Sequence, residues 1–308
     1  MNRILIVVML VLALAACQTI GRLGPHTAPF PANPVLSGEY DNHEQVWGGR
    51  ENATPIVAPH LVVSIEELPA GDWSIWHVRL DATTPLEATW ALHRSVAADG
   101  SVIMLPHRAS VANPALGKAF EAKEWVPLDA CALHGSVDAN GLSLSANGEA
   151  CAVLAPGIGA QAALLPLTID RTGEWLHLRL YVDQARGADA REDLRRLQVF
   201  GGWAAVNGAG PDAAADSNDW HMDRKVRLGS EGGRYTLAFR DGNPSGYSLL
   251  LERLTYREGN VPVLKLSIID DRSGRTLAYA WANPEATRIG LSLGWVQVGL
   301  DRAAVPAG

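Results

Sequence analysis

Residues 73–81 read WSIWHVRLD, and apolar and polar side chains alternate through the second half of this stretch. In an extended chain, Trp76, Val78 and Leu80 would share one face. The opposite face would then carry Trp73, Ile75, His77 and Arg79. A period of two is typical of a β-strand that lies between a core and water. The stretch therefore predicts a strand of an antiparallel sheet.

Similar short stretches recur along the chain, with turn residues between them. The predicted strands are 61–66, 73–81, 89–96, 101–105, 133–137, 142–145, 150–154, 162–170 and 175–183. Asn140-Gly141 lies between two of them and is a strong signal of a tight hairpin turn. Helices are predicted only at 36–47 and 189–197, the second with Asp189 as its cap. We expect an all-β fold, either a barrel or a sandwich.

The composition changes at residues 207–219, which are rich in Gly, Pro, Ala, Asp and Ser. Such a segment is typical of a linker or a long loop. Further strands are predicted at 235–239, 247–256, 263–270, 276–281 and 295–300. The pattern predicts a barrel over 35–206, a linker at 207–219 and a smaller C-terminal β segment at 220–301.

The first residues have the pattern of a lipoprotein signal peptide. Arg3 precedes an apolar run that is too short to span a bilayer, and two small residues lead to Cys17. We expect residues 1–16 to be removed, Cys17 to be lipidated and residues 17–34 to form a tether rich in Gly and Pro. Gln18 favours the outer membrane over the inner one, so the predicted location is the bacterial cell envelope, facing the periplasm. An ordinary secretory signal with a chance cysteine is the alternative.

The charge of the chain excludes some partners. The formal net charge is −7 and no run of Lys or Arg occurs, so nucleic acid is a poor partner. Apolar residues make up 47% of the chain, which is enough for a proper core.

After Cys17 only Cys131 and Cys151 remain, and in an oxidising compartment such a pair predicts a disulfide.

Several stretches resemble the CpcT/CpeT-type chromophore lyase family. They are GEYDNHEQ at 38–45, the segment from Asn113-Pro114 to WVPL at 125–128, the paired cysteines, ARG at 185–187 and VFGG at 199–202. The resemblance spans about residues 38–206. It implies a calyx-like antiparallel barrel, akin to lipocalins, with a ligand cavity. The known members of this family help to attach linear tetrapyrroles to cysteines of phycobiliproteins.

The candidate ligand-binding residues are Tyr40, Asn42, Gln45, His60, Trp73, Arg79 and Arg94. Asn42 and Gln45 would share a helix face and, with Tyr40, would hydrogen-bond a polar ligand at the mouth of the barrel. Alternatively, Asn42 caps a short helix and Gln45 packs behind it. The arginines would bind a carboxylate if they point inward, and are plain solvated strand residues if they point outward. Trp73 could face a cavity or, like Trp76, fill the core.

No recognised catalytic motif is present. His43-Glu44 begins like a zinc-binding helix, but Trp47 occupies the position of the second histidine, and no metal or cofactor is expected. Three functions stay open. The first is an envelope lipoprotein that binds a small amphiphilic ligand, for example a tetrapyrrole-like one, without a covalent bond. The others are a lyase-like enzyme that attaches a bilin to an acceptor cysteine, and a structural envelope lipoprotein with a filled barrel.

Overall fold

The computed structural model describes residues 36–52, 57–69, 71–138, 141–187, 189–256 and 261–304. The predicted signal peptide, Cys17, the tether and Asn140 of the predicted turn lie outside these ranges. The described residues form one compact unit. Within the described ranges, no helix is long and apolar enough to cross a membrane.

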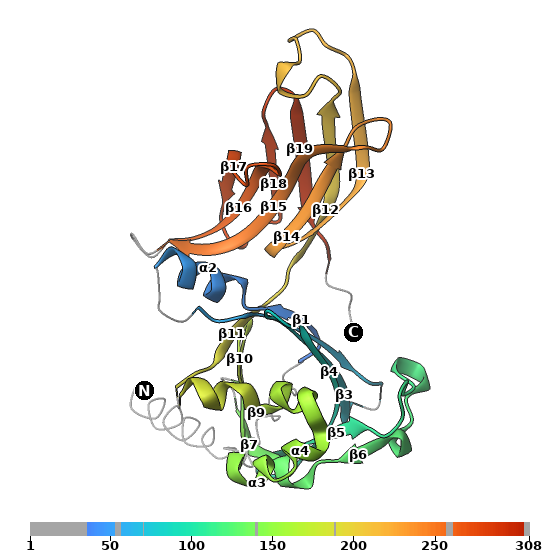
Figure 1. Cartoon of the computed structure of the whole chain (residues 1–308), viewed down its shortest axis with the longest axis vertical. Helices are drawn as coiled ribbons and strands as arrows, with labels where there is room; N and C mark the ends of the chain where they lie inside the picture. The colour runs from blue at the N-terminus through green and yellow to red at the C-terminus, as the bar shows by residue number, and fades with distance from the viewer. Residues whose placement is uncertain are drawn as a thin grey trace, which may run out of the picture. The chain divides into compact units, whose positions relative to one another are not determined.

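The first eleven strands form one antiparallel sheet that closes into a barrel (Figure 1), so the predicted all-β, calyx-like barrel is confirmed. The strand order is β4-β3-β2-β1-β11-β10-β9-β8-β7-β5, and pairing of β4 with β5 closes the ring, while β6 pairs with β5 outside it. The strands are β1 (Gly38–Asp41), β2 (His60–Glu67), β3 (Trp73–Asp81), β4 (Leu86–Val96), β5 (Ser101–Ala109), β6 (Trp125–Pro127), β7 (Leu133–Val137), β8 (Leu142–Ala146), β9 (Pro166–Thr172), β10 (Trp175–Leu180) and β11 (Glu192–Arg196).

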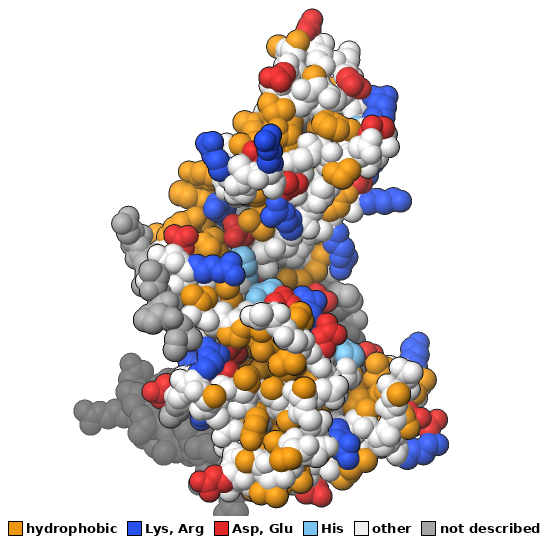
Figure 2. Space-filling view, viewed as in Figure 1, with side chains coloured by type: hydrophobic (Ala, Val, Ile, Leu, Met, Phe, Trp, Pro, Cys, Tyr) orange, Lys and Arg blue, Asp and Glu red, His pale blue; other side chains and the backbone are white. Residues whose placement is uncertain are grey.

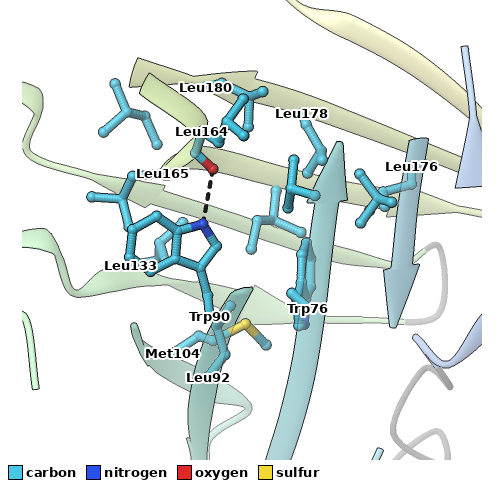
Figure 3. Packing of buried hydrophobic residues seen from close by; sticks show 14 of the residues in the cluster. Trp76, Trp90, Leu92, Met104, Leu133, Leu164, Leu165, Leu176, Leu178 and Leu180 are labelled. Atoms are coloured by element: carbon cyan, nitrogen blue, oxygen red, sulfur yellow. Dashed lines mark hydrogen bonds between the residues drawn. The ribbon is translucent and has the colours of Figure 1, made fainter. Parts of the chain in front are cut away.

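Large side chains occupy the interior of the ring. The alternation predicted for β3 is correct, because Trp76 and Val78 belong to the main core cluster and His77 is exposed. Trp76 and Trp90 are 0% exposed. The indole Nε1 of Trp90 donates a hydrogen bond of 3.1 Å to the carbonyl oxygen of Leu164 (Figure 3). Leucines from β4, β7 and β10 complete the packing around them.

A helical segment follows β8, where a strand was predicted at 150–154. It consists of α3 (Gly148–Ala152), α4 (Ala155–Ile158) and the 3-10 helix η4 (Gly159–Leu164). The side-chain oxygen of Asn147 accepts hydrogen bonds from Glu149 N and Ala150 N, and this cap favours a helix over a strand. The predicted disulfide is present and joins Cys131, in the short 3-10 helix η3 (Asp129–Cys131), to Cys151 of α3. The disulfide therefore ties the helical segment to the connection between β6 and β7.

The two predicted helices had different outcomes. The region 36–47 contains β1 and then α2 (His43–Glu51), so a helix is present but starts later. The helix predicted at 189–197 is wrong, because β11 lies there and pairs with β1 and β10. Leu194 points into the barrel core and is 0% exposed. Pairing with two strands outweighs a local capping signal.

The C-terminal region contains two four-stranded sheets with a core of their own. One has the order β13-β12-β19-β18 and the other β14-β15-β16-β17. Their strands are β12 (Val199–Asn207), β13 (Trp220–Gly229), β14 (Glu231–Ala238), β15 (Pro244–Tyr256), β16 (Val261–Asp270), β17 (Thr276–Ala282), β18 (Arg288–Ser292) and β19 (Val296–Arg302).

These sheets correct the predicted boundaries. The last barrel strand ends at Arg196, and β12 pairs with β13 and β19 instead, so the predicted barrel at 35–206 extends one strand too far. A Cβ atom at Gly202 would lie 2.1 Å from the carbonyl oxygen of Gly299, so the glycine permits this close pairing. The predicted linker 207–219 is the loop of a hairpin, since Asn207 pairs with Trp220.

Buried charges connect the last barrel strand to the C-terminal sheets. Glu231 Oε2 lies 2.8 Å from Arg195 Nη2 of β11, and Glu231 Oε1 lies 2.6 Å from Arg253 Nε of β15. Arg253 also binds Glu174, between β9 and β10, at 2.7 Å. Arg195, Glu231 and Arg253 are all buried. Buried charges require partners, and here each arginine supplies one to the carboxylate.

Candidate functional site

Four of the predicted ligand residues gather where β1 meets α2. Tyr40 is on β1, Asn42 precedes α2, Gln45 is on its first turn and His60 begins β2. Trp73, Arg79 and Arg94 lie elsewhere on β3 and β4. The geometry around Asn42 and His60 therefore defines the candidate site.

Tyr40 points into the barrel and is 0% exposed. Its hydroxyl donates a hydrogen bond of 3.0 Å to the carbonyl oxygen of Leu36 and accepts one of 3.3 Å from Arg171 Nε. Both polar functions of the hydroxyl thus have partners inside the protein. Tyr40 is a core residue, and the predicted position at a ligand mouth is wrong.

Asn42 is a fully buried amide that connects three segments of chain. Its Oδ1 accepts a hydrogen bond of 2.7 Å from Leu61 N. Its Nδ2 lies 2.9 Å from the carbonyl oxygen of Pro59, 2.8 Å from Glu192 Oε2 and 3.2 Å from Gln45 Oε1. The side chain makes no capping bond to α2. Asn42 therefore holds β2 and β11 against the start of the helix.

Gln45 is likewise occupied by backbone groups. Its Nε2 donates to the carbonyl oxygen of Arg191 at 2.9 Å, and its Oε1 accepts from Asp193 N at 3.1 Å. Both contacts fasten α2 to the start of β11. The alternative interpretation, in which Gln45 packs behind Asn42, is closer to the structure than direct ligand binding.

His60 lies between two carboxylates. Its Nε2 is 2.8 Å from Asp41 Oδ1, and its Nδ1 is 2.9 Å from Asp81 Oδ2. The hydrogen bond to Asp41, followed by the charges of Asp41 and Asp81, raises the pKa of His60 despite partial burial. Both ring nitrogens can donate at once only in the imidazolium form. The site therefore favours a charged histidine.

An open groove of about 510 Å³ adjoins His60, and this volume falls in the usual range for small ligands. Its lining residues are His43, Val46, Arg50, Val57, Ala58, Pro59, His60 and Asp81. The lining combines apolar side chains with the basic side chain of Arg50 and the paired side chains of His60 and Asp81. His43 Nε2 lies 3.0 Å from Glu252 Oε1, whereas no ion pair of Arg50 occurs among the described residues. The lining suits a molecule with an apolar body and one negative charge.

Glu192 lies behind Asn42 and was not predicted as a site residue. It is 1% exposed and forms an ion pair with Arg186, which also binds Asp183 at 3.0 Å. Burial raises the pKa of Glu192 to about 7, although Arg186 opposes this shift. Alternation along 192–196 would have placed Glu192 on the inward face with Leu194. The incorrect helix at 189–197 concealed that pattern.

The other three candidates do not converge on this site. Trp73 lies outside the barrel, with its ring centroid 4.7 Å from that of His107 and 5.1 Å from that of Phe120. Arg79 is half exposed on the outward face, 3.4 Å from Asp81. Arg94 lies beside a small cavity of about 10 Å³ and donates to the carbonyl oxygen of Gly71 at 2.7 Å. Arg79 and Arg94 therefore form no common carboxylate site.

No family model, curated protein or solved structure matches this chain. Within the described ranges, no group of three or more His, Cys, Asp or Glu side chains is arranged to hold a metal ion. Cys131 and Cys151 are joined as a disulfide, so neither offers a thiol nucleophile.

Proposed function

We propose that this chain is a lipid-anchored envelope protein that binds a small amphiphilic anion, without a covalent bond, in the groove beside α2. One observation carries the proposal. A groove of about 510 Å³ is lined by the exposed side chain of Val57 together with Arg50 and His60. The apolar side chains would cover the body of the ligand, and the cations would bind its carboxylate.

The packing of the barrel supports this groove over the interior as the binding place. The side chains of Trp76 and Trp90 fill the ring and are 0% exposed. A ligand in the interior would have to displace them, at a cost of several kcal/mol. The groove is already open and needs no such rearrangement.

Arg50 is the better anchor for the negative group. The charge of His60 is offset by two carboxylates at 2.8 and 2.9 Å, whereas Arg50 is exposed on the last turn of α2. An exposed guanidinium can bind a carboxylate through two parallel hydrogen bonds. His60 would add attraction while it keeps its proton.

The test is calorimetric titration of the full chain in lipid nanodiscs with biliverdin and with octanoate, using empty nanodiscs as the blank. Arg50→Ala should weaken binding at least tenfold. Arg240→Ala is the matched control, because Arg240 is exposed in the β14–β15 turn and pairs with Asp219. Absence of binding by the wild-type chain, or equal binding by the Arg50 variant, would contradict the proposal.

The same packing favours a second candidate, a structural envelope lipoprotein with a filled barrel. This candidate predicts that neither probe binds and that removal of the protein changes envelope integrity. Membership in the CpcT/CpeT-type family, with lyase activity, is a separate proposal. It would be tested by incubating the chain with a bilin and an acceptor phycobiliprotein and assaying for covalent attachment.

Anchoring is tested independently of any ligand. The apolar run and the two small residues before Cys17 support lipidation at this position. Cys17→Ala should release the protein into the soluble periplasmic fraction or leave it unprocessed. A variant that is cleaved and partitions into detergent as the wild type does would contradict the anchor.

A further inference from the structure

The barrel keeps a short free strand edge at the place where β5 leaves the sheet. The pairing of β4 with β5 ends at Trp90 and Arg108, and β5 itself ends at Ala109. Residues 86–89 of β4 pair with β3 on one side, but no described strand pairs with them on the other. Backbone N–H and C=O groups on that side of β4 are therefore open to an added strand.

A groove of about 560 Å³ lies beside this free edge, and this volume is in the usual range for small ligands. We call it the rim groove. Its walls come from β4, the end of β5, the loop after β5, and α4 with η4. Apolar side chains line part of it, among them Val111, Leu116 and Ile158. Figure 2 shows hydrophobic side chains over the region where Figure 1 places α3 and α4, with charged side chains at its margin.

The polar side chains of the rim groove have no partners inside the protein. Glu87 and Arg108 are exposed, and neither forms an ion pair in the part of the chain that the structure describes. The amides of Asn113 and Gln161 likewise make no hydrogen bond to any described residue. The amides and the histidine near α2 differ, because other parts of the chain already occupy them.

The anion and the cation lie at opposite ends of the free edge. Glu87 is three residues before Trp90, and Trp90 is the register partner of Arg108. Three residues of strand correspond to about 10 Å. An extended chain of three amino acids has about the same length. A ligand that reaches both charges therefore has the dimensions of a tripeptide.

We propose that the rim groove binds a short peptide with a free amino end and a free carboxyl end. The carboxylate would bind Arg108, and the ammonium group would bind Glu87. The peptide would run parallel to β4 and hydrogen-bond its free edge, as strands added to a sheet do. Asn113 and Gln161 would bind further backbone groups, and Leu116 would contact an apolar side chain.

The charges of the rim groove argue against other small ligands. A fatty acid would leave Glu87 without a partner, and a phosphate ester would be repelled by it. A neutral molecule would use neither charge. A peptide supplies a cation, an anion and backbone amides together, so it matches all the unpartnered groups of the rim groove.

The test is calorimetric titration of the full chain in lipid nanodiscs with the tripeptide Ala-Leu-Ala, using empty nanodiscs as the blank. Amidation of its carboxyl end should weaken binding about tenfold, and so should acetylation of its amino end, because each removes one charge-assisted hydrogen bond. Arg108→Gln should weaken binding of the free peptide by a similar factor and should abolish the effect of amidation. Glu87→Gln should likewise abolish the effect of acetylation.

Two variants are controls. Arg240→Gln removes an exposed arginine in the β14–β15 turn and should leave peptide binding unchanged. Arg50→Ala should also bind the peptide as the wild type does, so this test and that of the α2 groove fail independently.

Three results would overturn the proposal. One is absence of Ala-Leu-Ala binding, or binding that neither amidation nor Arg108→Gln weakens. Another is binding of octanoate that depends on Arg108 without any binding of the peptide, which would assign the rim groove to simple carboxylates. The last is peptide binding that Arg50→Ala abolishes and Arg108→Gln does not, which would place the peptide beside α2.

Discussion

The barrel and the C-terminal sheets are both antiparallel, but the barrel is closed and the C-terminal sheets are open. The barrel closes through β4 and β5, so every strand of the ring has two neighbours. The two C-terminal sheets stay open, and β17 pairs only with β16. Trp76 and Trp90 of the barrel are 0% exposed, whereas the C-terminal region exposes Tyr279 and Trp281. Closure removes the edges at which partners can bind, and open sheets retain them.

The largest expected effect comes from emptying the barrel. Trp90→Ala should lower the free energy of unfolding by about 3–5 kcal/mol, because it removes a fully buried ring and its hydrogen bond to Leu164. Trp281→Ala should cost about 0.5 kcal/mol or less, since its side chain is more than half exposed. Urea unfolding of both variants measures the contrast. Equal losses would show that the difference in burial between the two regions does not govern stability.

The second prediction concerns the buried ion pairs that connect the barrel to the C-terminal sheets. Glu231→Gln should lower the free energy of unfolding by about 3 kcal/mol, because two buried arginines lose their shared carboxylate. The loss is limited by the remaining partners, Glu44 of Arg195 and Glu174 of Arg253. Hydrogen exchange should show faster opening of both β11 and β15. Protection unchanged in β11 would mean that the regions open independently. Glu285→Gln is the control, since Glu285 pairs with Arg302 and its side chain is 65% exposed.

Strand pattern and cysteine pairing could be predicted from the sequence, but the filling of the interior could not. Alternation in β3 placed Trp76 inward correctly, because one sheet face must avoid water. Alternation says nothing about ring diameter, so it could not tell whether those inward side chains leave a cavity. The resemblance to a calyx-forming family therefore pointed to the lumen, whereas the groove next to His60, one of the predicted residues, lies outside the ring beside α2.

Only part of the candidate site could be predicted, because its contacts join residues that are distant in the sequence. Asn42, Gln45 and His60 do lie together, yet their polar atoms bind other parts of the chain. Those partners, Glu192 above all, are distant in sequence and become visible only through the pairing of β1 with β11. The sequence around Arg50 contains no recognised motif. Arg50 lines the groove only because α2 packs over β2.

The disulfide gives the barrel a crosslink that the described C-terminal residues lack. Replacing Cys131 and Cys151 together by serine should lower the free energy of unfolding by about 2–4 kcal/mol, since the crosslink restricts the unfolded chain. Hydrogen exchange should quicken first in α3 and α4, and β15 should be unaffected. Thiol titration that finds both cysteines free in periplasmic protein would contradict the crosslink itself.

The fourth prediction concerns the pH dependence of stability that arises from a buried carboxyl group of the barrel, Glu192. Because burial raises the pKa of Glu192 to about 7, the folded state binds a proton more tightly than the unfolded state does. Stability should therefore fall, on the order of 2 kcal/mol, as pH rises from about 4.5 to 7. Glu192→Gln should flatten this slope, whereas Glu149→Gln, at an exposed position on α3, should leave it unchanged. A slope that persists in the Glu192 variant would assign the proton to another group.

The smallest effect is expected at His60, and it has a different pH window. The hydrogen bond to Asp41 raises the pKa of His60, so its contribution is complete below the ordinary value of 6.5 and is lost as pH rises through the raised value. The side chain is 31% exposed, so the loss should be about 1 kcal/mol or less. His60→Asn should remove this part of the pH profile, and His77→Asn, on the exposed face of β3, should not. NMR titration of the imidazole measures the pKa directly. A value at or below 6.5 would mean that Asp41 and Asp81 do not hold His60 in its charged form, and the proposed attraction of an anion to the α2 groove would then rest on Arg50 without His60.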